Sequence, residues 1–175
     1  MDDIINKVKN KLGEGVRSNL YRLDIRFPFP TPEIDETSHV LITSTQVPAI
    51  KTGSPITQKI VYGKEVKFGS VTRTFDPFTG TVLNDKKLTY RNAFEKWIND
   101  YIANWNTNEN RLPEEYETDC TLSLLSVDGN TVLKRYKLYN CFPESIDTIN
   151  LSSDTEEIQK FNFTIHYVGL DIFDE

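Results

Sequence analysis

Residues 116–140 read YETDCTLSLLSVDGNTVLKRYKLYN, two runs of strand-forming residues on either side of Asp128-Gly129-Asn130. Asp-Gly-Asn is a good three-residue turn for a β-hairpin. A turn of this length pairs Leu122 with Tyr136 and so fixes the register of both strands. One face then collects the apolar side chains Cys120, Leu122, Leu124, Tyr136 and Leu138. The opposite face carries Thr121, Ser123, Arg135 and Lys137. The hairpin therefore predicts an antiparallel sheet with one buried and one wet face.

The same register predicts that Cys141 points to the face opposite Cys120, which argues against a disulfide between them. Two cysteines cannot build a disulfide framework, so we expect both to be small buried side chains. Neither belongs to a CxxC pair, and His39 and His166 are far apart in the sequence. We therefore expect no metal site and no cofactor.

The remaining segments extend this sheet. Residues 21–27 and 161–167 alternate apolar and polar side chains with the period of a half-buried strand. Further strands are expected near 39–46 and 71–83. Residues 50–72 are interrupted by glycines and predict a long exposed hairpin.

Helical periodicity is confined to two segments. Residues 91–103 carry an apolar stripe made of Phe94, Trp97, Ile98 and Tyr101. Near the N-terminus, a second stripe consists of Ile4, Ile5, Val8 and Leu12. The second helix is short and must dock on another surface to be stable. Residues 1–175 are thus expected to form one mainly β domain. Its two packed β-sheets, as a sandwich or barrel, would have one flanking α-helix and a short N-terminal helix.

Composition and charge narrow the possible functions. The 175-residue chain has 20 basic and 26 acidic residues, a formal net charge of −6, which argues against a surface that grips nucleic acid. Basic residues outnumber acidic ones in residues 1–90, and the reverse holds in residues 91–175. If the two halves lie on opposite sides of the fold, this asymmetry favours head-to-tail self-association; if they interleave, it disappears.

Catalytic motifs are missing from the sequence, which has no GxGxxG, P-loop or GxSxG pattern. Its paired carboxylates lie in polar segments or at the C-terminus, where solvent keeps their pKa values from being split for acid–base work. No apolar run reaches the length of a transmembrane helix, and the acidic N-terminus is unlike a signal peptide. We therefore expect a soluble domain that is not an enzyme.

Four stretches have a familiar order and spacing. They are RSNLYRLDI at 17–25, RTFDPFTGTVLND at 73–85, YKLYNCFPESI at 136–146, and LSSD at 151–154 followed by EIQKF at 157–161. Together they resemble the tail tube protein family of contractile-tailed bacteriophages. The resemblance covers nearly the whole chain and implies a single tail-tube-like domain over residues 1–175.

This resemblance implies a structural protein of the virion tail, assembled in the host cytoplasm. Six subunits would join their inner strands into one closed β-barrel, and the rings would stack head to tail as a homohexameric tube. Its partners would be further copies of itself and the tail sheath, baseplate and tail-terminator proteins. Genomic DNA would pass through the lumen during ejection without specific binding, and the chain would not insert into membranes.

Three alternatives stay open. The chain could be a baseplate protein that initiates the tube, or a tube protein of a related contractile injection or secretion system. It could also be a ligand-binding β-barrel that does not assemble, which would need a closed pocket within one subunit.

Two groups of residues are candidates for the contacts of such a tube. The N-terminal helix and the 49–72 segment are expected to reach the adjacent ring, with candidate contacts Ile4, Ile5, Val8, Gly53, Ser54, Pro55 and Ile56. By resemblance, the strands near 39–47, 57–64, 117–127 and 131–140 would line the lumen. The lumen-facing candidates are Thr121, Ser123, Arg135 and Lys137, whose cations we expect to be offset by acids from the Glu114–Asp119 run. In the rival arrangement this face points outward, toward the sheath.

Overall fold

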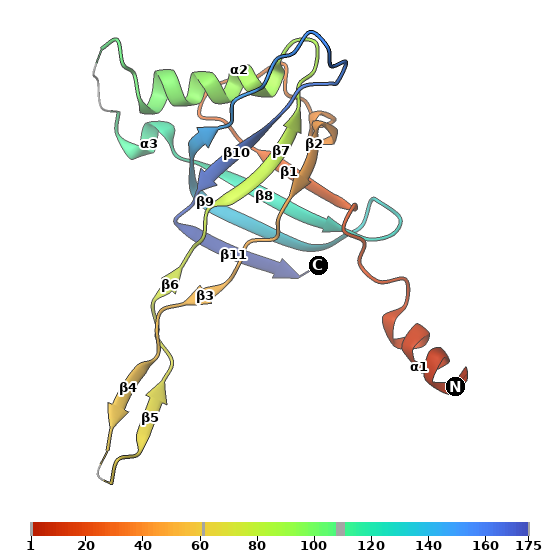
Figure 1. Cartoon of the computed structure of the whole chain (residues 1–175), viewed down its shortest axis with the longest axis vertical. Coiled ribbons are helices and arrows are strands. Elements are labelled where there is room, and N and C mark those ends of the chain that lie inside the picture. The colour runs from red at the N-terminus through yellow and green to blue at the C-terminus, as the bar shows by residue number, and fades with distance from the viewer. Residues whose placement is uncertain (1, 61, 108–110, 175) are drawn as a thin grey trace.

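One long strand organises the fold. The computed structural model describes residues 2–60, 62–107 and 111–174. Strand β9 (Val132–Ile146) takes part in two walls of antiparallel strands (Figure 1). Its first half pairs with β8 (Thr118–Leu125) on one side and β11 (Gly169–Asp174) on the other, and β8 pairs with β1 (Tyr21–Ile25). These four strands form what we call the β8 sheet.

The second wall is built on the other half of β9. This half pairs with β10 (Lys160–His166), which is followed by β7 (Phe78–Leu83) and β2 (Ile42–Thr45). We call it the β7 sheet. The Tyr21 hydroxyl donates to the carbonyl oxygen of Ile42 at 2.9 Å and so links the two outermost strands. Over the described ranges no ladder joins β1 to β2, so the sheets are packed but do not form a closed barrel. The predicted mainly β class is confirmed.

The core lies between the two sheets and is rich in aromatic rings. Trp97 and Phe94 lie at its centre with no exposed surface, and Phe94 stacks on Phe163 of β10 with ring centroids 5.2 Å apart. Phe27, just after β1, packs edge-on against both Phe94 and Trp97. Trp97 also donates from Nε1 to the carbonyl oxygen of Tyr116 at 2.8 Å, which fixes the depth of the indole ring. Helix and both sheets therefore share one core.

Helix α2 (Thr89–Lys96) begins beside a carboxylate. Asp85 accepts hydrogen bonds from the amide and the hydroxyl of Thr89, each at 2.7 Å. These bonds hold the pKa of Asp85 below its ordinary value, because they favour the charged carboxylate. The helix continues as a π-helical segment, η2 (Trp97–Ile102), so the helix predicted over 91–103 is present with a wider second half.

Several boundaries differ from the sequence-based expectation. The strand expected near 39–46 starts as a 3-10 helix, η1 (Ser38–Leu41), because its first residues close a turn over Asp35 rather than join a ladder. The strand expected over 71–83 is divided into β6 (Arg73–Thr74) and β7, with Pro77 between them. A one-turn helix, α3 (Pro113–Tyr116), lies in a segment that the sequence predicts to be a loop, of which residues 108–110 are outside the described chain. Strand β11 was not predicted.

The register of the central hairpin is as predicted. Leu122 pairs with Tyr136 and Ser123 with Arg135. The prediction for Cys141 is wrong, because the ladder shifts near Thr118 and Asn140 adopts a left-handed backbone with φ of 54°. Cys141 is therefore buried in the same core as Cys120, and both are free thiols. Hydrogen bonding between the two thiols and burial raise the pKa of Cys120.

Gly80 on β7 is a place where packing demands a missing side chain. A Cβ atom there would lie 2.6 Å from Cζ of Phe163, whose ring is fully buried. We expect Gly80→Ala to destabilise the subunit by about 1–3 kcal/mol, since neither the ring nor the backbone of the neighbouring strand can move freely. Urea unfolding measures this cost. Gly69→Ala is the control, since Gly69 has open space around it and no positive φ; equal stability of both variants would contradict the packing seen here.

Candidate functional site

The first surface feature is a hairpin that projects from the body. Its base pairs β3 (Lys51–Thr52) with β6, and its distal part pairs β4 (Ile56–Lys59) with β5 (Glu65–Phe68). Figure 1 shows this arm extending well beyond the two sheets. Every residue of its four strands is exposed. The exposed large apolar side chains of the arm are Ile50, Ile56, Ile60, Val66, Phe68 and Val71.

This arm confirms the long exposed hairpin predicted over 50–72. The contact candidates Gly53, Ser54, Pro55 and Ile56 lie where its base passes into its distal part. Gly53 donates its amide to the carbonyl oxygen of Thr72 at 2.8 Å, which continues the basal ladder across the arm. Residue 61, within the segment 57–64 proposed for the lumen, is outside the part of the chain that the structure describes.

The second projecting feature is the N-terminal helix, α1 (Asp2–Leu12). The side chains of Ile4, Ile5 and Val8 are 67%, 46% and 56% exposed, so its apolar stripe has no cover within the subunit. An isolated helix of this length is marginal in water, so α1 needs a partner to be stable. Figure 1 places α1 and the hairpin apart from each other, and the two sets of contact candidates do not meet within one subunit.

The third feature is the outer, polar face of the β8 sheet. The lumen candidates Thr121, Ser123, Arg135 and Lys137 lie together on this face, because Thr121 pairs with Lys137 and Ser123 with Arg135. Ser123 is only 5% exposed, since it lies between Arg22 and Arg135 across the ladders. The sequence thus identified a contiguous polar surface.

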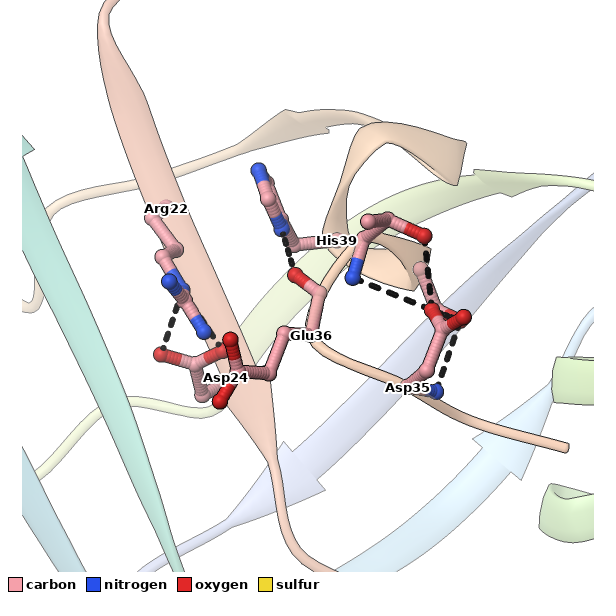
Figure 2. Close-up of polar contacts among 7 residues, drawn as sticks. Arg22, Asp24, Asp35, Glu36 and His39 are labelled. Atoms are coloured by element: carbon pink, nitrogen blue, oxygen red, sulfur yellow. Dashed lines mark hydrogen bonds and ion pairs between the residues drawn. The ribbon is translucent and has the colours of Figure 1, made fainter. Parts of the chain in front are cut away.

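Acids on the same face balance its cations. Lys137 lies 3.6 Å from the carboxylate of Asp119, at the end of the acidic run that we expected to supply such a partner. On β1, Arg22 bonds the carboxylate of Asp24 at 3.0 Å, as Figure 2 shows. These pairs are half-exposed and stabilise the fold little, but they neutralise the face.

Strand β11 completes this face with groups that the sequence analysis missed. Asp171 pairs with Lys137 in the ladder and accepts a hydrogen bond from Tyr139. Burial and this bond raise the pKa of Tyr139, because both disfavour the phenolate. Lys137 lies over the Tyr139 ring, 4.7 Å from its centroid. The alternation of Gly169–Asp174 was too short to find from the sequence, whereas the alternating Arg22 and Asp24 were visible there.

A rigid loop borders the polar face and makes an open groove with it. Asp35 accepts from the amide and hydroxyl of Thr37 and from the hydroxyl of Ser38, which lowers its pKa. His39 contacts the carbonyl oxygen of Glu36 with Nδ1 at 2.6 Å (Figure 2). The groove between this loop, β1 and β8 has a volume of about 1060 Å³. It is wide and open, so it suits contact with a surface better than capture of a small molecule.

The outer face of the β7 sheet has a different character. Hydroxyl and amide groups form a hydrogen-bonded row across its strands. Ser44 donates to Thr81 at 3.0 Å, Thr81 donates to Asn162 at 2.6 Å, and Asn162 donates to Asp147 at 2.8 Å. Two opposite faces, one charge-balanced and one mostly uncharged, are therefore available to water or to other subunits.

Other kinds of site find no support in these residues. Within residues 2–60, 62–107 and 111–174, no three His, Cys, Asp or Glu side chains gather as a metal site would require. No helix in the same ranges is long and apolar enough to span a membrane.

Comparison with known proteins agrees with this picture. Residues 15–169 match the family model described as phage tail tube protein. The chain is 26% identical to the tail tube protein gp19 of Enterobacteria phage T4, over 94% of this chain and 95% of that protein.

Solved structures share the fold at lower identity. A subunit of the anti-feeding prophage cap, a tube-terminating cap, superposes with a TM-score of 0.65 at 17% identity, covering 91% of each chain. A subunit of the sheath-tube complex of an extracellular contractile injection system gives a TM-score of 0.57 at 13% identity, covering 97% of each chain.

Proposed function

Results

Sequence analysis

Residues 116–140 read YETDCTLSLLSVDGNTVLKRYKLYN, two runs of strand-forming residues on either side of Asp128-Gly129-Asn130. Asp-Gly-Asn is a good three-residue turn for a β-hairpin. A turn of this length pairs Leu122 with Tyr136 and so determines the register of both strands. One face then collects the apolar side chains Cys120, Leu122, Leu124, Tyr136 and Leu138. The opposite face carries Thr121, Ser123, Arg135 and Lys137. The hairpin therefore predicts an antiparallel sheet with one buried and one wet face.

The same register predicts that Cys141 points to the face opposite Cys120, which argues against a disulfide between them. Two cysteines cannot build a disulfide framework, so we expect both to be small buried side chains. Neither belongs to a CxxC pair, and His39 and His166 are far apart in the sequence. We therefore expect no metal site and no cofactor.

The remaining segments extend this sheet. Residues 21–27 and 161–167 alternate apolar and polar side chains with the period of a half-buried strand. Further strands are expected near 39–46 and 71–83. Residues 50–72 are interrupted by glycines and predict a long exposed hairpin.

Helical periodicity is confined to two segments. Residues 91–103 carry an apolar stripe made of Phe94, Trp97, Ile98 and Tyr101. Near the N-terminus, a second stripe consists of Ile4, Ile5, Val8 and Leu12. The second helix is short and must dock on another surface to be stable. Residues 1–175 are thus expected to form one mainly β domain. Its two packed β-sheets, arranged as a sandwich or barrel, would have one flanking α-helix and a short N-terminal helix.

Composition and charge narrow the possible functions. The 175-residue chain has 20 basic and 26 acidic residues, a formal net charge of −6, which argues against a surface that grips nucleic acid. Basic residues outnumber acidic ones in residues 1–90, and the reverse holds in residues 91–175. If the two halves lie on opposite sides of the fold, this asymmetry favours head-to-tail self-association; if they interleave, it disappears.

Catalytic motifs are missing from the sequence, which has no GxGxxG, P-loop or GxSxG pattern. Its paired carboxylates lie in polar segments or at the C-terminus, where burial cannot split their pKa values for acid–base work. No apolar run reaches the length of a transmembrane helix, and the acidic N-terminus is unlike a signal peptide. We therefore expect a soluble domain that is not an enzyme.

Four stretches share an order and spacing with a known family. They are RSNLYRLDI at 17–25, RTFDPFTGTVLND at 73–85, YKLYNCFPESI at 136–146, and LSSD at 151–154 followed by EIQKF at 157–161. Together they resemble the tail tube protein family of contractile-tailed bacteriophages. The resemblance covers nearly the whole chain and implies a single tail-tube-like domain over residues 1–175.

This resemblance implies a structural protein of the virion tail, assembled in the host cytoplasm. Six subunits would join their inner strands into one closed β-barrel, and these homohexameric rings would stack head to tail into a tube. Its partners would be further copies of itself and the tail sheath, baseplate and tail-terminator proteins. Genomic DNA would pass through the lumen during ejection without specific binding, and the chain would not insert into membranes.

Three alternatives stay open. The chain could be a baseplate protein that initiates the tube, or a tube protein of a related contractile injection or secretion system. It could also be a ligand-binding β-barrel that does not assemble, which would need a closed pocket within one subunit.

Two groups of residues are candidates for the surfaces of such a tube. The N-terminal helix and the 49–72 segment are expected to reach the adjacent ring, with candidate contacts Ile4, Ile5, Val8, Gly53, Ser54, Pro55 and Ile56. By resemblance, the lumen would be lined by the strands near 39–47, 57–64, 117–127 and 131–140. The lumen-facing candidates are Thr121, Ser123, Arg135 and Lys137, whose cations we expect to be offset by acids from the Glu114–Asp119 run. In the rival arrangement this face points outward, toward the sheath.

Overall fold

One long strand organises the fold. The computed structural model describes residues 2–60, 62–107 and 111–174. Strand β9 (Val132–Ile146) takes part in two walls of antiparallel strands, one with each of its halves (Figure 1).

The first wall is built on the first half of β9. This half pairs with β8 (Thr118–Leu125) on one side and with β11 (Gly169–Asp174) on the other, and β8 pairs with β1 (Tyr21–Ile25). We call these strands the β8 sheet. Its alternating residues turn one face toward the core and the other toward solvent.

The second wall, which we call the β7 sheet, is built on the other half of β9. This half pairs with β10 (Lys160–His166), which is followed by β7 (Phe78–Leu83) and β2 (Ile42–Thr45). The Tyr21 hydroxyl donates to the carbonyl oxygen of Ile42 at 2.9 Å and so links the two outermost strands. Over the described ranges no ladder joins β1 to β2, so the sheets do not form a closed barrel. The predicted mainly β class is confirmed.

The core lies between the two sheets and is rich in aromatic rings. Trp97 and Phe94 have no exposed surface, and Phe94 stacks on Phe163 of β10 with ring centroids 5.2 Å apart. Phe27, just after β1, packs edge-on against both Phe94 and Trp97. Trp97 also donates from Nε1 to the carbonyl oxygen of Tyr116 at 2.8 Å, which holds the indole ring in place. The internal helix and both sheets therefore share one core.

Helix α2 (Thr89–Lys96) begins beside a carboxylate. Asp85 accepts hydrogen bonds from the amide and the hydroxyl of Thr89, each at 2.7 Å. These bonds hold the pKa of Asp85 below its ordinary value, because they favour the charged carboxylate. The helix continues as a π-helical segment, η2 (Trp97–Ile102), so the helix predicted over 91–103 is present with a wider second half.

Two predicted strands are shorter than expected. The strand expected near 39–46 starts as a 3-10 helix, η1 (Ser38–Leu41), because its first residues close a turn over Asp35 rather than join a ladder. The strand expected over 71–83 is divided into β6 (Arg73–Thr74) and β7, with Pro77 between them.

Two elements have no counterpart among the predictions. A one-turn helix, α3 (Pro113–Tyr116), lies in a segment whose polar, Asn-rich sequence predicts a loop, and residues 108–110 of that segment are outside the described chain. Strand β11 is the other, and it adds an edge to the β8 sheet.

The register of the central hairpin is as predicted, with Leu122 opposite Tyr136. The prediction for Cys141 is wrong, because the ladder shifts near Thr118 and Asn140 adopts a left-handed backbone with φ of 54°. Cys141 is therefore buried in the same core as Cys120, and both are free thiols. The hydrogen bond between the two thiols and their burial raise the pKa of Cys120.

Gly80 on β7 is a position where packing excludes a side chain. A Cβ atom there would lie 2.6 Å from Cζ of Phe163, whose ring is fully buried. We expect Gly80→Ala to destabilise the subunit by about 1–3 kcal/mol, since the ring has no free space to move into. Urea unfolding measures this cost. Gly69→Ala is the control, since Gly69 has open space around it; equal stability of the two variants would contradict this packing.

Candidate functional site

The first surface feature is a hairpin that projects from the body. Its base pairs β3 (Lys51–Thr52) with β6, and its distal part pairs β4 (Ile56–Lys59) with β5 (Glu65–Phe68). Figure 1 shows this arm extending well beyond the two sheets. Every residue of its four strands is exposed. The exposed large apolar side chains of the arm include Ile50, Ile56, Ile60, Val66, Phe68 and Val71.

This arm confirms the long exposed hairpin predicted over 50–72. The contact candidates Gly53, Ser54, Pro55 and Ile56 lie where its base passes into its distal part. Gly53 donates its amide to the carbonyl oxygen of Thr72 at 2.8 Å, which continues the basal ladder across the arm. Residue 61, within the segment 57–64 expected near the lumen, is outside the part of the chain that the structure describes.

The second projecting feature is the N-terminal helix, α1 (Asp2–Leu12). The side chains of Ile4, Ile5 and Val8 are exposed, so its apolar stripe has no cover within the subunit. An isolated helix of this length is marginal in water, so α1 needs a partner to be stable. Figure 1 places α1 and the hairpin apart from each other, so one subunit does not bring the two sets of contact candidates together.

The third feature is the outer, polar face of the β8 sheet. All four lumen candidates lie on it, because Thr121 pairs with Lys137 and Ser123 pairs with Arg135. Ser123 is only 5% exposed and lies between Arg22 and Arg135 across the two ladders. The strand expected near 39–47 belongs to the other wall, so the four segments expected near the lumen do not share one face of a subunit.

Acids on the same face balance its cations. Lys137 lies 3.6 Å from the carboxylate of Asp119, the last residue of the acidic run expected to supply such a partner. On β1, Arg22 bonds the carboxylate of Asp24 at 3.0 Å, as Figure 2 shows. These pairs are half-exposed and stabilise the fold little, but they reduce the positive charge of the face. The alternation of Arg22 and Asp24 along the first predicted strand was the signal that could have placed them here.

Strand β11 completes this face with groups that sequence reasoning misses. Asp171 lies opposite Lys137 in the ladder and accepts a hydrogen bond from Tyr139. Burial and this bond raise the pKa of Tyr139, because both disfavour the phenolate. The ammonium of Lys137 lies 4.7 Å from the centroid of the Tyr139 ring. Lys137 therefore has both carboxylates and an aromatic ring beside it.

A well-bonded loop borders the polar face and forms an open groove with it. Asp35 accepts from the hydroxyl and amide of Thr37 and from the hydroxyl of Ser38, which lowers its pKa. His39 contacts the carbonyl oxygen of Glu36 with Nδ1 at 2.6 Å (Figure 2). The groove between this loop, β1 and β8 has a volume of about 1060 Å³. It is open and lined by both polar and apolar side chains, so it suits contact with a broad surface better than capture of a small molecule.

The outer face of the β7 sheet has a different character. Hydroxyl and amide groups form a hydrogen-bonded row across its strands. Ser44 donates to Thr81 at 3.0 Å, and Thr81 donates to Asn162 at 2.6 Å. Asn162 in turn donates to Asp147 at 2.8 Å. The subunit thus offers two outer faces, one with paired charges and one dominated by uncharged polar groups.

Other kinds of site find no support. Within residues 2–60, 62–107 and 111–174, no three His, Cys, Asp or Glu side chains gather as a metal site would require. No helix in those ranges is long and apolar enough to span a membrane.

Comparison with known proteins agrees with the resemblance seen in the sequence. Residues 15–169 match the family model described as phage tail tube protein. The chain is 26% identical to the tail tube protein gp19 of Enterobacteria phage T4, over 94% of this chain and 95% of that protein.

Solved structures share the fold at lower identity. A chain of the anti-feeding prophage cap, a tube-terminating cap, superposes with a TM-score of 0.65 at 17% identity, covering 91% of each chain. A chain of the sheath-tube complex of an extracellular contractile injection system gives a TM-score of 0.57 at 13% identity, covering 97% of each chain.

Proposed function

The chain belongs to the phage tail tube protein family, and from this premise we propose that six copies close into a ring and that rings stack head to tail around a DNA channel. It is a structural protein of the virion tail rather than an enzyme. The whole-length similarity to a tail tube protein favours the tube itself over a baseplate initiator.

The observation that carries this proposal is the pair of arms. Both α1 and the 50–72 hairpin expose apolar side chains to solvent, and neither has a core of its own. A monomer gains nothing from such arms, because exposed apolar surface costs free energy in water. In a stacked assembly each arm buries that surface against a neighbouring subunit.

The polar face of the β8 sheet is our proposed lumen wall. Bare cations on the wall would bind passing phosphates, and the cost of releasing them would grow with the number of contacts. Here Lys137 has Asp119 beside it and Arg22 has Asp24, so the wall presents paired charges. Such a wall lets DNA slide without holding it.

The remaining partners follow from this arrangement. The β7 sheet would then face outward, toward a contractile sheath, and the ends of the tube would meet baseplate and terminator proteins. Lateral contacts within a ring would use β11, which pairs only with β9 among the described strands. Its exposed Ile172 and Phe173 lie on this open edge, where a neighbouring subunit would cover them.

Thiol labelling tests both the tube and its wall. Thr121 on the β8 sheet and Thr164 on the β7 sheet are matched positions, since both are half-buried threonines on outer faces. In assembled tubes, a thiol reagent too bulky to enter the lumen should modify Thr164→Cys as fast as it does in dissociated subunits. Thr121→Cys should react at least tenfold more slowly in tubes than in subunits.

The wild type serves as the background control, because its two native thiols are buried. The opposite labelling pattern would place the β7 sheet on the lumen. If each cysteine reacts as fast in the assembled sample as in dissociated subunits, neither face is enclosed, which contradicts the tube.

A further inference from the structure

The projecting hairpin carries a net positive charge. Residues 50–72 contain the four lysines Lys51, Lys59, Lys64 and Lys67, and Glu65 is the single acid. Lys51 at the base is paired with Asp76, but Lys64 and Lys67 lie on the exposed distal part. Exposed Ile56 and Phe68 pair across the distal strands. The described distal part of the hairpin is therefore both basic and apolar.

The segment between β9 and β10 has the complementary composition. Residues 147–159, which we call the acidic loop, contain Asp147, Asp154, Glu156 and Glu157 and no basic residue. Leu151 and Ile158 of this loop are 77% and 71% exposed. The loop folds around an open groove of about 740 Å³. It is therefore acidic and apolar, with a hollow in which another chain could lie.

The two surfaces lie at opposite ends of the molecule. Strand β7 starts at Phe78, on the side where β6 and the hairpin leave the body, and ends at Leu83. At that far end Leu83 pairs with Lys160, and Asn84 donates its amide to the carbonyl oxygen of Gln159. The acidic loop is thus one strand length away from the root of the hairpin, and the arm points the other way (Figure 1).

We propose that the acidic loop of one subunit receives the distal hairpin of a subunit in the next ring. This inference rests on the proposed stacking and names the receiving surface for it. Complementary surfaces at opposite ends form a heterologous contact, which repeats along an axis instead of closing on itself. The lysines of the hairpin meet the carboxylates of the loop, and the apolar residues of both are removed from water.

Basic residues beside the acidic loop limit where the basic hairpin of the next ring can bind. Lys86 and Lys87 lie in the adjacent turn before α2, and Lys160 starts β10. These lysines would repel the basic hairpin from the surface next to the acidic loop. The hairpin therefore docks over Asp154, Glu156 and Glu157 rather than over the helix.

Charge reversal on each side tests the pairing. The hairpin variant carries Lys64→Glu and Lys67→Glu, which leaves the cross-strand pair of Lys59 and Glu65 intact. The loop variant carries Asp154→Lys, Glu156→Lys and Glu157→Lys. All five side chains are exposed, so both variants should melt at the temperature of the wild type. Each variant alone should raise the protein concentration needed for tubes, measured by pelleting and negative stain, at least tenfold.

Two rescues make the test specific. A chain that carries both sets of substitutions should form tubes again, and so should an equimolar mixture of the two single-side variants, in which rings alternate. The pairing is overturned if either single-side variant stacks as well as the wild type, or if neither rescue restores stacking. Failure of the wild type itself to form tubes is a different result, and it overturns the proposed function together with this pairing.

Discussion

We expect that replacing residues 54–71 with a two-residue Asn-Gly turn abolishes tube formation and leaves a folded subunit. Gly53 and Thr72 already form a ladder hydrogen bond, so a tight turn can join them without strain. The distal strands are fully exposed and add nothing to the core. The melting temperature should therefore stay the same, while the polymerised fraction at a concentration where the wild type assembles should fall at least tenfold.

A second variant tests whether stacking depends on the apolar contact of the hairpin or only on its length. Ile56→Ser with Phe68→Ser keeps the hairpin but removes its exposed apolar pair. We expect it to weaken stacking in the same direction, because less apolar surface is buried between rings. Long tubes formed by the shortened chain would exclude the hairpin from the axial contact.

The largest effect on stability is expected at Trp97. Its ring is fully buried, packs 5.3 Å from the ring of Phe27, and donates a hydrogen bond to Tyr116. Trp97→Ala should cost about 3–5 kcal/mol, because it opens a cavity between helix and sheets and leaves a carbonyl without its donor. That loss is a large share of the roughly 5–15 kcal/mol that keeps a domain folded.

Trp105→Ala provides the matched control. Trp105 is 86% exposed, so its removal should change the free energy of unfolding by less than about 0.5 kcal/mol. Urea unfolding followed by circular dichroism, at a concentration below assembly, compares the two variants. Similar stabilities would mean that the helix does not share a core with the sheets.

The sequence predicts most of the body of the fold. Alternation is strong in β1 and β10, and the Asp128-Gly129-Asn130 turn determines the register of β8 and β9 because the hairpin is local. The face of Cys141 was not predictable from that register. A left-handed Asn140 shifts the strand by a bulge, and asparagine is only one of several residues that adopt this conformation.

The candidate surfaces were predicted in part. Thr121 and Lys137 share a face because they lie on one hairpin, whereas Asp171 comes from a strand joined by long-range pairing that no local pattern reveals. The charge asymmetry between the two halves of the chain is retained in only part of the structure. Strands of both halves interleave in the sheets, so the asymmetry disappears there. It survives in the basic hairpin and the acidic loop, where each half extends beyond the sheets.

Electron cryomicroscopy of the purified protein, over a range of concentrations up to the highest attainable, tests the assembly directly. The expected result is stacked six-membered rings in which the polar face of the β8 sheet lines the channel and each hairpin reaches the acidic loop of the next ring. Monomers at every concentration, with no rings or tubes in the micrographs, would contradict it.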